Sequence, residues 1–533
     1  GVVGGVVNVI DHRIPKESLD GVMARGETKF GGADNERSAV AVGDVGNGLF
    51  AIHADVYTRQ TNDLEIPDSA IRRLNAAGKN EHVSRGRLVN SAAKSAGGAV
   101  GASLTFDQGH IGLSYSESNS NYGTVAEPSV KVDMLSQRWD FSSEIHDLDY
   151  FVNRVKFKMA YTDYQHQELD HGEVGTTFLN KGVEATLEAG HGKIGDVSGV
   201  FGFQTQNSKF EALGAEAFVP STHTSSQGFY VYEELPIDQL KLSIGGRLDM
   251  LTVKSLSDEL NYKFGDAESK KFTPKNLSLG GEYSFNDHWS LTASLNHTER
   301  APRQNELFSY GPHVATNQYE IGNKNLNEEK ANGFDMKVHW KAGNNSISLG
   351  GFYTKFSNFI GTSSTGKLVN ADGLEAQPDS TLSEARVYGA KALFKGAEAQ
   401  AKFRVYERLG ELDLNLRADY VRATNEDTGT PLPRIAPMRM GVGFDYQFSQ
   451  FSSNIDFLHG FKQDRIDVNE RATDGYTLMN ATASYRFKTD FRLEAFVKAR
   501  NLLDQDIREH SSFLKEIAPM GGRSLLVGLR GEF

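Results

Sequence analysis

The sequence has no cysteine among its 533 residues, and this absence excludes several classes of site at once. A chain without thiols has no disulfide, no thiolate zinc site, no iron–sulfur cluster and no cysteine nucleophile. It also has no run of about 18 to 20 consecutive apolar residues, the length that a membrane-spanning helix needs. Basic residues number 57 against 69 acidic ones, and the net charge of −12 argues against a nucleic-acid-binding protein.

Catalytic motifs are missing as well. The sequence contains no G-x-S-x-G, no P-loop and no H-E-x-x-H pattern, so it has no recognisable nucleophile elbow, nucleotide cradle or zinc-protease helix. Proline is scarce, with 13 residues, whereas glycine (54), phenylalanine (32) and tyrosine (19) are frequent. Because glycine favours turns and aromatic residues favour strands, we expect an all-β protein. Because the catalytic motifs are missing, we do not expect an enzyme.

Apolar and polar residues alternate over many segments, and this period of two is typical of strands with one apolar and one polar face. Near the C-terminus the alternation covers residues 479–487 and again residues 491–499, with only residues 488–490 between them. Two strands joined by a short turn account for this pattern. Residues 412–420 and 289–296 alternate in the same way. Several runs reach about nine or ten residues, the length with which a tilted strand crosses a bilayer.

A soluble β-sandwich would show the same alternation, but its strands are usually only about 5–6 residues long. The connections in this chain are of two kinds, because short turns such as 285–287 alternate with long polar stretches over 304–330, 360–383 and 425–434. Short turns at one end and long loops at the other are typical of outer-membrane barrels. The alternation also continues to Phe533, an aromatic residue in the apolar register.

The length of the chain sets the size of the barrel. A unit of strand, turn and loop of about 23 to 24 residues gives about 22 strands over residues 18–533, the number typical of plugged outer-membrane transporters. A porin of about 16 to 18 strands is the alternative, and it would need longer loops throughout. We therefore expect an all-β, transmembrane, antiparallel barrel of about 22 strands.

The first residues, Gly1–Ile10, form an apolar stretch interrupted by glycines, and a charged segment follows at Asp11–Arg13. This stretch is either an ordinary first strand or part of another domain. Its G-x-x-G-G-x-x-N pattern resembles the last strand of the plug domain of TonB-dependent receptors, which leads into their barrel. The resemblance divides the chain into the end of a plug at residues 1–17 and a barrel at residues 18–533. It also implies a plug, a TonB box and a signal peptide before residue 1.

A longer succession of motifs supports the same resemblance. The chain has, in this order, Arg300-Ala301-Pro302, Glu306-Leu307, His313-Val314-Ala315-Thr316 and the stretch Glu320–Glu329. These are similar to the R-A-P, E-L, H-x-A-T and E-x-G-N-x-x-L-x-x-E motifs of TonB-dependent receptors. Within that family the chain is most similar to zinc receptors of the ZnuD type, to which residues 510–514 and 519–521 are also similar. The resemblance extends, with gaps, from Gly1 to Phe533.

The resemblance implies a zinc site that is divided between the barrel and the plug. Glu168, at the end of the stretch Thr162–Glu168, matches a glutamate ligand of the family, and His313 matches a histidine ligand. The remaining ligands in the family are an aspartate and a histidine of the plug. One carboxylate together with imidazoles is a suitable tetrahedral ligand set for zinc.

The residues around Glu168 support its assignment as a metal ligand independently of the resemblance. In an extended segment residues two apart share a face, so His166, Glu168 and Asp170 point the same way, and His171 follows them. This is the densest cluster of histidine and carboxylate residues in the chain, and a solvated acidic loop is the ordinary alternative. For His313 the ordinary alternative is a loop histidine bonded to the backbone. The glycine and proline before it, however, indicate a fixed loop.

These observations predict a monomeric receptor in the outer membrane of a Gram-negative bacterium. Surrounded by outer-membrane lipid, it would import zinc with energy supplied through TonB and its inner-membrane complex. One feature departs from the best-known zinc receptors, which carry a long outer loop rich in histidine and aspartate. The corresponding residues 141–149 contain a single histidine, His146.

Import of haem or of a ferric siderophore is the alternative function. Haem receptors also place a histidine between an R-A-P segment and an N-x-N-L segment, as His313 lies here between residues 300–302 and 323–326. Phe308, Tyr310 and Tyr319 would then supply an apolar pocket beside that histidine. A passive porin without a plug is a third possibility from a different class of function.

Overall fold

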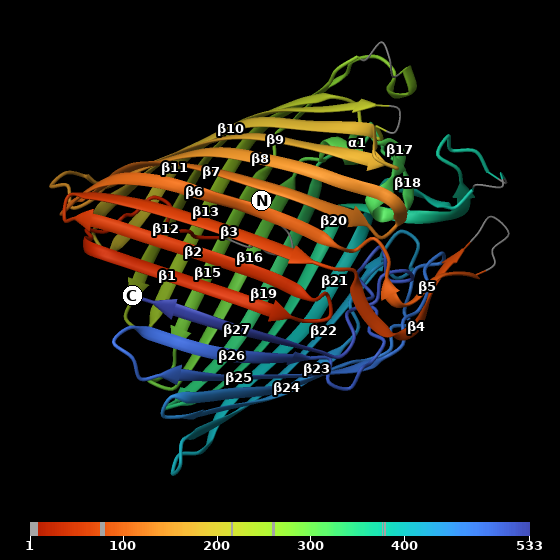
Figure 1. The fold of residues 1–533 in the computed structure, drawn as a ribbon. Coiled ribbons are helices and arrows are strands. Elements are labelled where there is room, and N and C mark those ends of the chain that lie inside the picture. Colours follow the sequence, from red (N-terminus) through yellow and green to blue (C-terminus); the bar gives the residue numbers. More distant parts are fainter. Residues whose placement is uncertain (1–8, 75–79, 215–216, 258–261, 376, 378–379) are drawn as a thin grey trace.

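Strand β1 (Asp20–Gly31) pairs with strand β27 (Ser524–Glu532), and this antiparallel contact closes one sheet into a barrel. The computed structural model describes residues 9–74, 80–214, 217–257, 262–375, 377 and 380–533. Within these ranges, twenty-two strands form the barrel wall, and neighbouring wall strands are antiparallel (Figure 1). The expected antiparallel barrel of about 22 strands is confirmed, and the alternative porin size of about 16 to 18 strands is wrong.

The wall strands follow one another in chain order. The first part of the wall contains β1, β2 (Glu36–Asn47), β3 (Phe50–Thr61), β6 (Ala93–Phe106), β7 (Gly109–Thr124), β8 (Glu127–Ile145), β9 (Val152–Asp170), β10 (Glu173–Ile194), β11 (Val197–Gly214), β12 (Thr222–Ile237) and β13 (Leu240–Ser255). The second part contains β15 (Lys275–Ser284), β16 (Trp289–Arg300), β19 (Glu329–Ala342), β20 (Asn345–Val369), β21 (Leu382–Tyr406), β22 (Glu411–Asn425), β23 (Arg439–Phe448), β24 (Phe451–Gly460), β25 (Tyr476–Phe487), β26 (Arg492–Arg500) and β27.

The shorter elements lie in the long connections. Strands β4 (Leu64–Leu74) and β5 (Asn80–Leu88) form a separate hairpin, and β14 (Ser269–Phe272) continues the pairing of β15 along β13. The other short elements are η1 (Tyr262–Phe264), α1 (Gln304–Phe308), β17 (Tyr310–His313), η2 (Val314–Thr316) and β18 (Gln318–Ile321). Strand β18 pairs in parallel with β21. None of the helices in the described part of the chain is long and apolar enough to span a membrane.

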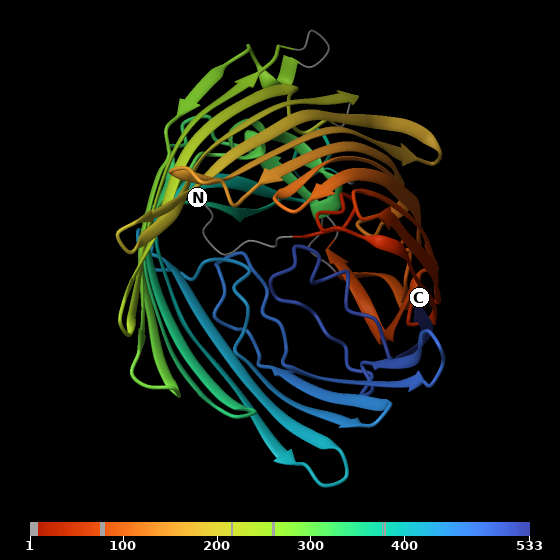
Figure 2. The same ribbon diagram turned by 90° about the vertical axis from the view of Figure 1, so that its left-hand side faces the viewer.

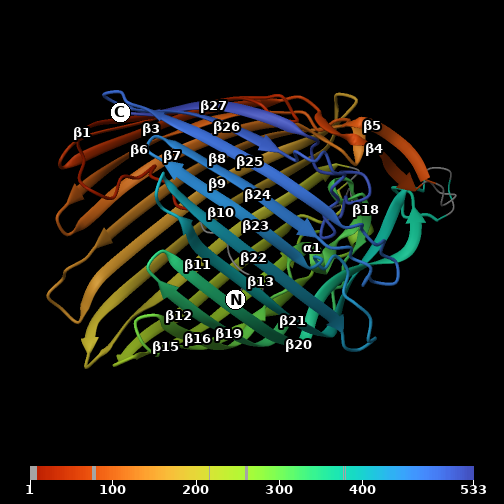
Figure 3. The same ribbon diagram turned by 90° about the horizontal axis from the view of Figure 1, so that it is seen from below.

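The connections at the two ends of the barrel differ in length, and Figure 3 shows the strands running obliquely between these ends. At the short-turn end, the predicted turns after residues 284 and 487 are confirmed. At the long-loop end, the loop expected over residues 360–383 is shorter than predicted, because β20 continues to Val369 and β21 begins at Leu382. Polar side chains there bond across the strands, as Ser364 and Ser383 do at 2.9 Å, so a polar sequence does not end the strands.

Each wall strand presents an apolar outer face and a polar inner face. On β27, Leu525, Val527 and Leu529 are 62%, 49% and 45% exposed. On the other face of this strand, Arg530 forms an ion pair of 2.6 Å with Glu494 of β26. Apolar side chains that are exposed around a closed barrel face lipid, whereas paired charges face its aqueous interior. This division explains why the sequence as a whole has a polar composition.

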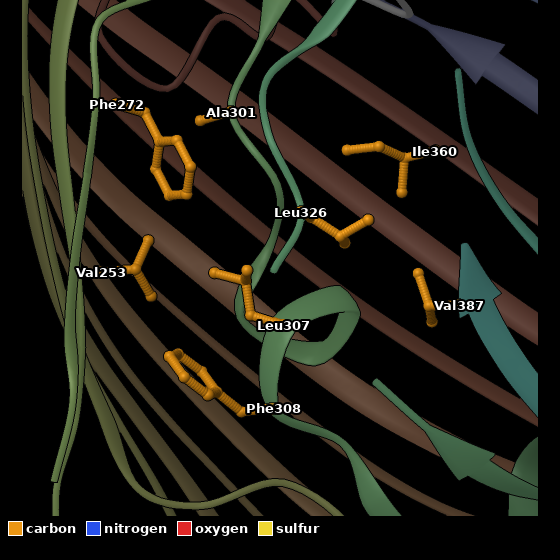
Figure 4. Packing of buried hydrophobic residues seen from close by; sticks show 8 residues of the cluster. All are labelled: Val253, Phe272, Ala301, Leu307, Phe308, Leu326, Ile360 and Val387. Atoms are coloured by element: carbon orange, nitrogen blue, oxygen red, sulfur yellow. The ribbon is translucent and has the colours of Figure 1, made fainter. Parts of the chain in front are cut away.

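Apolar residues gather at the long-loop end around α1. Leu307 and Phe308 of this helix pack against residues of β13, β14, β20, β21 and the 301–328 loop, namely Val253, Phe272, Ile360, Val387, Ala301 and Leu326 (Figure 4). Leu307 is only 1% exposed. Burial of this kind stabilises by about 1.5–3 kcal/mol for each large side chain, and it therefore fixes the 301–328 loop to the barrel. Seen along the barrel, the loops of the C-terminal third also lie within the outline of the wall (Figure 2).

Residues 9–19 precede β1 and contact the inner wall. Arg13 Nε donates to Asp55 Oδ2 on β3 at 3.3 Å. His53, which is 3% exposed, lies between Asp55 and Asp44, with its ring nitrogens 3.0 and 2.7 Å from their carboxylate oxygens. The backbone carbonyl of Arg13 also lies against Gly101 of β6, where a Cβ atom would be only 1.7 Å away. The residues before the barrel are therefore fastened by both charge and close backbone packing.

The predicted domain boundary at residue 18 falls two residues before the start of β1. Residues 1–8, which carry most of the plug-like pattern, lie outside the described residues. The division into a plug end and a barrel stays a prediction.

Replacing Gly101 by alanine is expected to displace residues 13–19, because the new Cβ would collide with the Arg13 carbonyl. In outer-membrane vesicles we expect tryptic cleavage after Arg13 and Lys16 to become roughly tenfold faster, since cleavage follows local opening. Gly43 on β2 has no atom within 4 Å of its Cβ position, so Gly43→Ala is the matched control. Equal cleavage rates in the two variants would contradict the proposed packing.

Candidate functional site

Arg300, the last residue of β16, holds the 301–328 loop in place. Its guanidinium lies between two carboxylates, with Nη1 donating to Glu306 Oε2 at 2.8 Å and Nη2 donating to Glu329 Oε2 at 3.2 Å. Glu306 also accepts a hydrogen bond from the N–H of Arg303, and Glu329 accepts one from the N–H of Ile360. The three charged side chains are 21%, 17% and 7% exposed. Arg300 and Glu329, the first and last residues of the succession of motifs, thus form an ion pair that closes the loop.

His313 ends β17 within this loop, and its imidazole is fixed on two sides. Nδ1 lies 2.7 Å from Glu320 Oε1 on β18, and the ring stacks on Phe218 with centroids 4.2 Å apart and planes 12° apart. In the described part of the molecule, Nε2 of His313 has no hydrogen-bond partner. A carboxylate that accepts the Nδ1 proton leaves the Nε2 lone pair available, which is the arrangement of a metal-binding histidine. The side chain is 27% exposed, so a ligand can reach it.

Phe218 connects His313 to a second histidine through a series of aromatic contacts. Its ring centroid lies 6.4 Å from that of Phe178 on β10, and His166 of β9 stacks on Phe178 at 4.5 Å. Nδ1 of His166 is buried without a hydrogen-bond partner. The fold therefore brings two predicted ligand residues, which are distant in sequence, to the two ends of one series of ring contacts, in which the planes of Phe178 and Phe218 are tilted by 56°. We call His166, Phe178, Phe218 and His313 the histidine stack.

The other predicted ligands lie along β9 and its turn. Glu168 is two residues beyond His166 and therefore shares its face of the strand. Asp170 ends β9, and His171 begins the turn with a φ of 48°. The Nδ1 atom of His171 lies 2.8 Å from Asp170 Oδ1, and both side chains are more than half exposed. The structure thus separates this cluster into His166, which belongs to the histidine stack, and a solvent-exposed pair, Asp170 and His171, at the tip.

A complete metal site is not formed by these residues. Among the residues that the structure describes, no group of three or more histidine, aspartate and glutamate side chains is placed to hold a metal ion. The joint role of Glu168 and His313 as ligands of one ion stays a prediction.

The aromatic residues expected beside His313 lie in different surroundings. Phe308 belongs to the apolar cluster around α1, and Tyr319 is 4% exposed beneath Tyr310, with ring centroids 5.8 Å apart. Burial and the neighbouring Tyr310 raise the pKa of Tyr319 to about 12, so its hydroxyl stays neutral. Tyr310 is 45% exposed. The ring in contact with His313 is instead Phe218, which sequence reasoning missed because no local pattern marks it.

A buried ion pair joins two other loops at this end of the barrel. Glu470 Oε1 accepts hydrogen bonds from Lys515 Nζ at 2.7 Å and from the N–H of Arg434 at 2.8 Å. His510 Nε2 lies 3.2 Å from the same oxygen, and its Nδ1 is 3.0 Å from Thr473 Oγ1. Burial raises the pKa of Glu470, but the neighbouring His510 and Lys515 outweigh it and lower this pKa to about 2. The carboxylate is therefore ionised at neutral pH, and its role is to fasten the loops.

Comparison with known proteins identifies relatives of this barrel. A family model described as "TonB dependent receptor-like, beta-barrel" matches residues 46–502. The haem/hemopexin utilization protein C of Haemophilus influenzae (strain 86-028NP) is 25% identical over an alignment of 339 residues, and the match covers 58% of this chain. The aligned stretch spans 44% of the length of that relative.

Solved structures share the fold at low identity. The copper transporter OprC superimposes with a TM-score of 0.79 and 18% identity, over 97% of this chain and 81% of that one. The FrpB iron transporter of Neisseria meningitidis superimposes with a TM-score of 0.74 and 14% identity, over 97% of this chain and 82% of that one. At such identities the likeness concerns the fold alone.

Proposed function

The chain belongs to the TonB-dependent receptor family, and from this premise we propose that it imports a metal ion, with zinc as the first candidate cargo. Its barrel is that of an outer-membrane receptor of Gram-negative bacteria, and its relatives are transporters and receptors rather than enzymes. The specificity for zinc, and with it the ZnuD-type assignment, is part of the proposal.

One observation carries the proposal, namely the state of the His313 imidazole. The Glu320 carboxylate accepts a hydrogen bond from Nδ1, Phe218 holds the plane of the ring, and Nε2 is left for a ligand. His166 lies at the other end of the histidine stack, and Glu168 follows it two residues further along the same strand. Neutral imidazoles and one carboxylate are suitable donors for Zn²⁺. In this proposal Glu168 and His313 are barrel ligands, and His166, Asp170 and His171 are secondary candidates.

The proposal includes a plug that completes the site. Residues 1–17 would be the end of that plug, and the contacts of Arg13 with Asp55 and Gly101 suit a segment that links a moving plug to a fixed wall. Cargo bound jointly by plug and barrel would be released when TonB, driven by its inner-membrane complex, displaces the plug. We further propose that the receptor is a monomer.

Haem is the second candidate, and a specific observation favours it. Haem needs an axial histidine beside an aromatic surface, and His313 stacked on Phe218 supplies both. The curated relative from Haemophilus influenzae carries haem in its name. A ferric siderophore would use the same mouth of the barrel.

Titration of the purified full receptor distinguishes the two cargoes. We expect ZnCl₂ to bind with a dissociation constant below about 1 μM in isothermal titration calorimetry, and haem to show no Soret shift, since a specific receptor needs about −8 kcal/mol or better. A Soret shift on addition of haem that is absent in the His313→Ala variant would show that haem, rather than zinc, is the cargo. If neither ligand binds, both candidate cargoes are wrong.

A further inference from the structure

Four lysines and a histidine form a row on the outward face of the wall, near the long-loop end. Lys181 of β10 lies opposite Lys209 of β11 in the pairing register, and Lys209 lies opposite His223 of β12. His223 in turn lies opposite Lys254 of β13. Lys271 of β14 extends the row by one strand, because it pairs with the residue two positions before Lys254. We call Lys181, Lys209, His223, Lys254 and Lys271 the basic row.

The alternation along the strands shows that the basic row faces outward. Lys209 shares its face of β11 with Phe201, which is 44% exposed, and Lys254 shares its face of β13 with Met250, which is also 44% exposed. Val253, on the other face of β13, is buried in the cluster around α1. The basic row therefore lies at the long-loop edge of the apolar band, where lipid head groups begin.

Side chains of like charge that lie directly opposite each other on paired strands destabilise a sheet, because their Cβ atoms are only about 4.5–5.5 Å apart. Lys181 and Lys209 form such a pair. Each of them has a carboxylate at 2.8 Å, supplied by Asp163 of β9 and by Glu211 of β11. The protein thus balances the charges at this end of the basic row.

The protein does not balance the other end of the basic row. In the part of the chain that the structure describes, Lys254 and Lys271 have no carboxylate at ion-pair distance, and both are exposed. Lys270 points to the opposite face of β14 and pairs with Glu268 at 3.3 Å. Four lysines face two carboxylates, which leaves the basic row with an excess of two positive charges.

A comparable line on earlier strands carries no such excess. It passes outward-facing residues of β3, β6, β7 and β8 that lie opposite one another, namely Gln60, Lys94, Asn121 and Asp133. Its single lysine and its single aspartate cancel in charge. An excess of positive charge is thus a property of particular strands, which lie side by side in the wall (Figure 1), and not of the whole rim.

We propose that the basic row binds the phosphate groups of an anionic lipid in the outer leaflet of the membrane. The long loops of such barrels are extracellular, so this edge of the apolar band meets the outer leaflet. Since neighbouring strands are about 4.7–4.9 Å apart, the row is roughly 19 Å long and exceeds a single phosphate group. Apolar side chains continue on the same face of β11 and β13, and only a lipid contacts both these and the lysines. The proposal is independent of the cargo.

Native mass spectrometry of the purified full receptor tests the proposal, with diphosphoryl lipid A as the probe. We expect Lys254→Gln combined with Lys271→Gln to raise the dissociation constant of this lipid by about 25-fold, or about fivefold for each lysine at a charged surface. Lys254→Arg combined with Lys271→Arg keeps both charges and is expected to stay within about twofold of the wild type. All these side chains are exposed, so we expect the melting temperature to stay unchanged.

Lys94→Gln combined with Lys131→Gln is the matched control, because it removes two outward lysines from β6 and β8 at the same end of the barrel. We expect this variant to bind the lipid within about twofold of the wild type. Unchanged binding in the glutamine variant of Lys254 and Lys271, or an equal loss in the control, would overturn the proposal. Phosphatidylcholine that binds as tightly as diphosphoryl lipid A would do so too. Displacement of the lipid by an equimolar amount of inorganic phosphate would show a site for free phosphate instead.

Discussion

Replacing His313 by alanine is expected to lower the affinity of the full receptor for zinc by about 100-fold, because the change removes an imidazole whose Nε2 is left for a ligand. Glu320→Gln keeps the ring but weakens the acceptor that orients it, and we expect a loss of about tenfold. Glu168→Ala is expected to resemble His313→Ala if both residues bind the same ion. Calorimetric titration with ZnCl₂ measures all three variants.

His223→Ala provides the matched control for this series. His223 is an exposed histidine of β12, on the opposite face from the buried Thr222. His223→Ala removes one histidine, as His313→Ala does, but it does not alter the histidine stack. Zinc affinity within about twofold of wild type in the double variant of Glu168 and His313 would show that these residues are not the ligands.

Replacing Arg300 by alanine is expected to destabilise the 301–328 loop by about 3 kcal/mol, because two largely buried carboxylates would lose their shared cation. Hydrogen exchange of the loop amides should then accelerate by roughly 100-fold, since about 1.4 kcal/mol corresponds to a factor of ten. The loop carries His313, so cargo binding is expected to weaken as well. Exchange measured by mass spectrometry follows the loop separately from the wall.

Two controls separate the loss of charge balance from the loss of an arginine as such. Arg492→Ala removes an arginine that is 76% exposed and paired with Glu532 at 3.4 Å, and it should cost less than about 1 kcal/mol. The triple variant Arg300→Met, Glu306→Gln, Glu329→Gln removes all three charges, so it should restore much of the protection. Equal exchange in wild type and Arg300→Ala would mean that the apolar packing of α1 alone holds the loop.

The wall of the barrel was predictable because its signal is local. A strand that separates lipid from an aqueous interior must alternate in polarity at every second residue, and residues 479–487 and 491–499 did so. The prediction failed over residues 360–369, where β20 continues beyond the expected boundary. Where both faces of a strand are polar, the alternation disappears although the pairing persists.

The candidate site was predictable only in part. Its histidines could be named from motif and spacing, and Glu320 belonged to a recognised motif without an assigned role. Phe218, which contacts His313, carries no local signal. Its position depends on the connection between β11 and β12. Such contacts join residues that are far apart in the chain, and periodicity does not encode them.

The sequence by itself determined the class of the fold, the approximate number of strands and the end of the barrel at which the long loops lie. These properties follow from alternation and spacing, which act over a few residues at a time. Only the tertiary structure decided that β1 meets β27, that Arg300 joins Glu306 to Glu329, and that His166 and His313 stack on two phenylalanines that contact each other. Those arrangements depend on which loops pack together once the barrel has closed, because closure brings the ends of distant strands to the same rim.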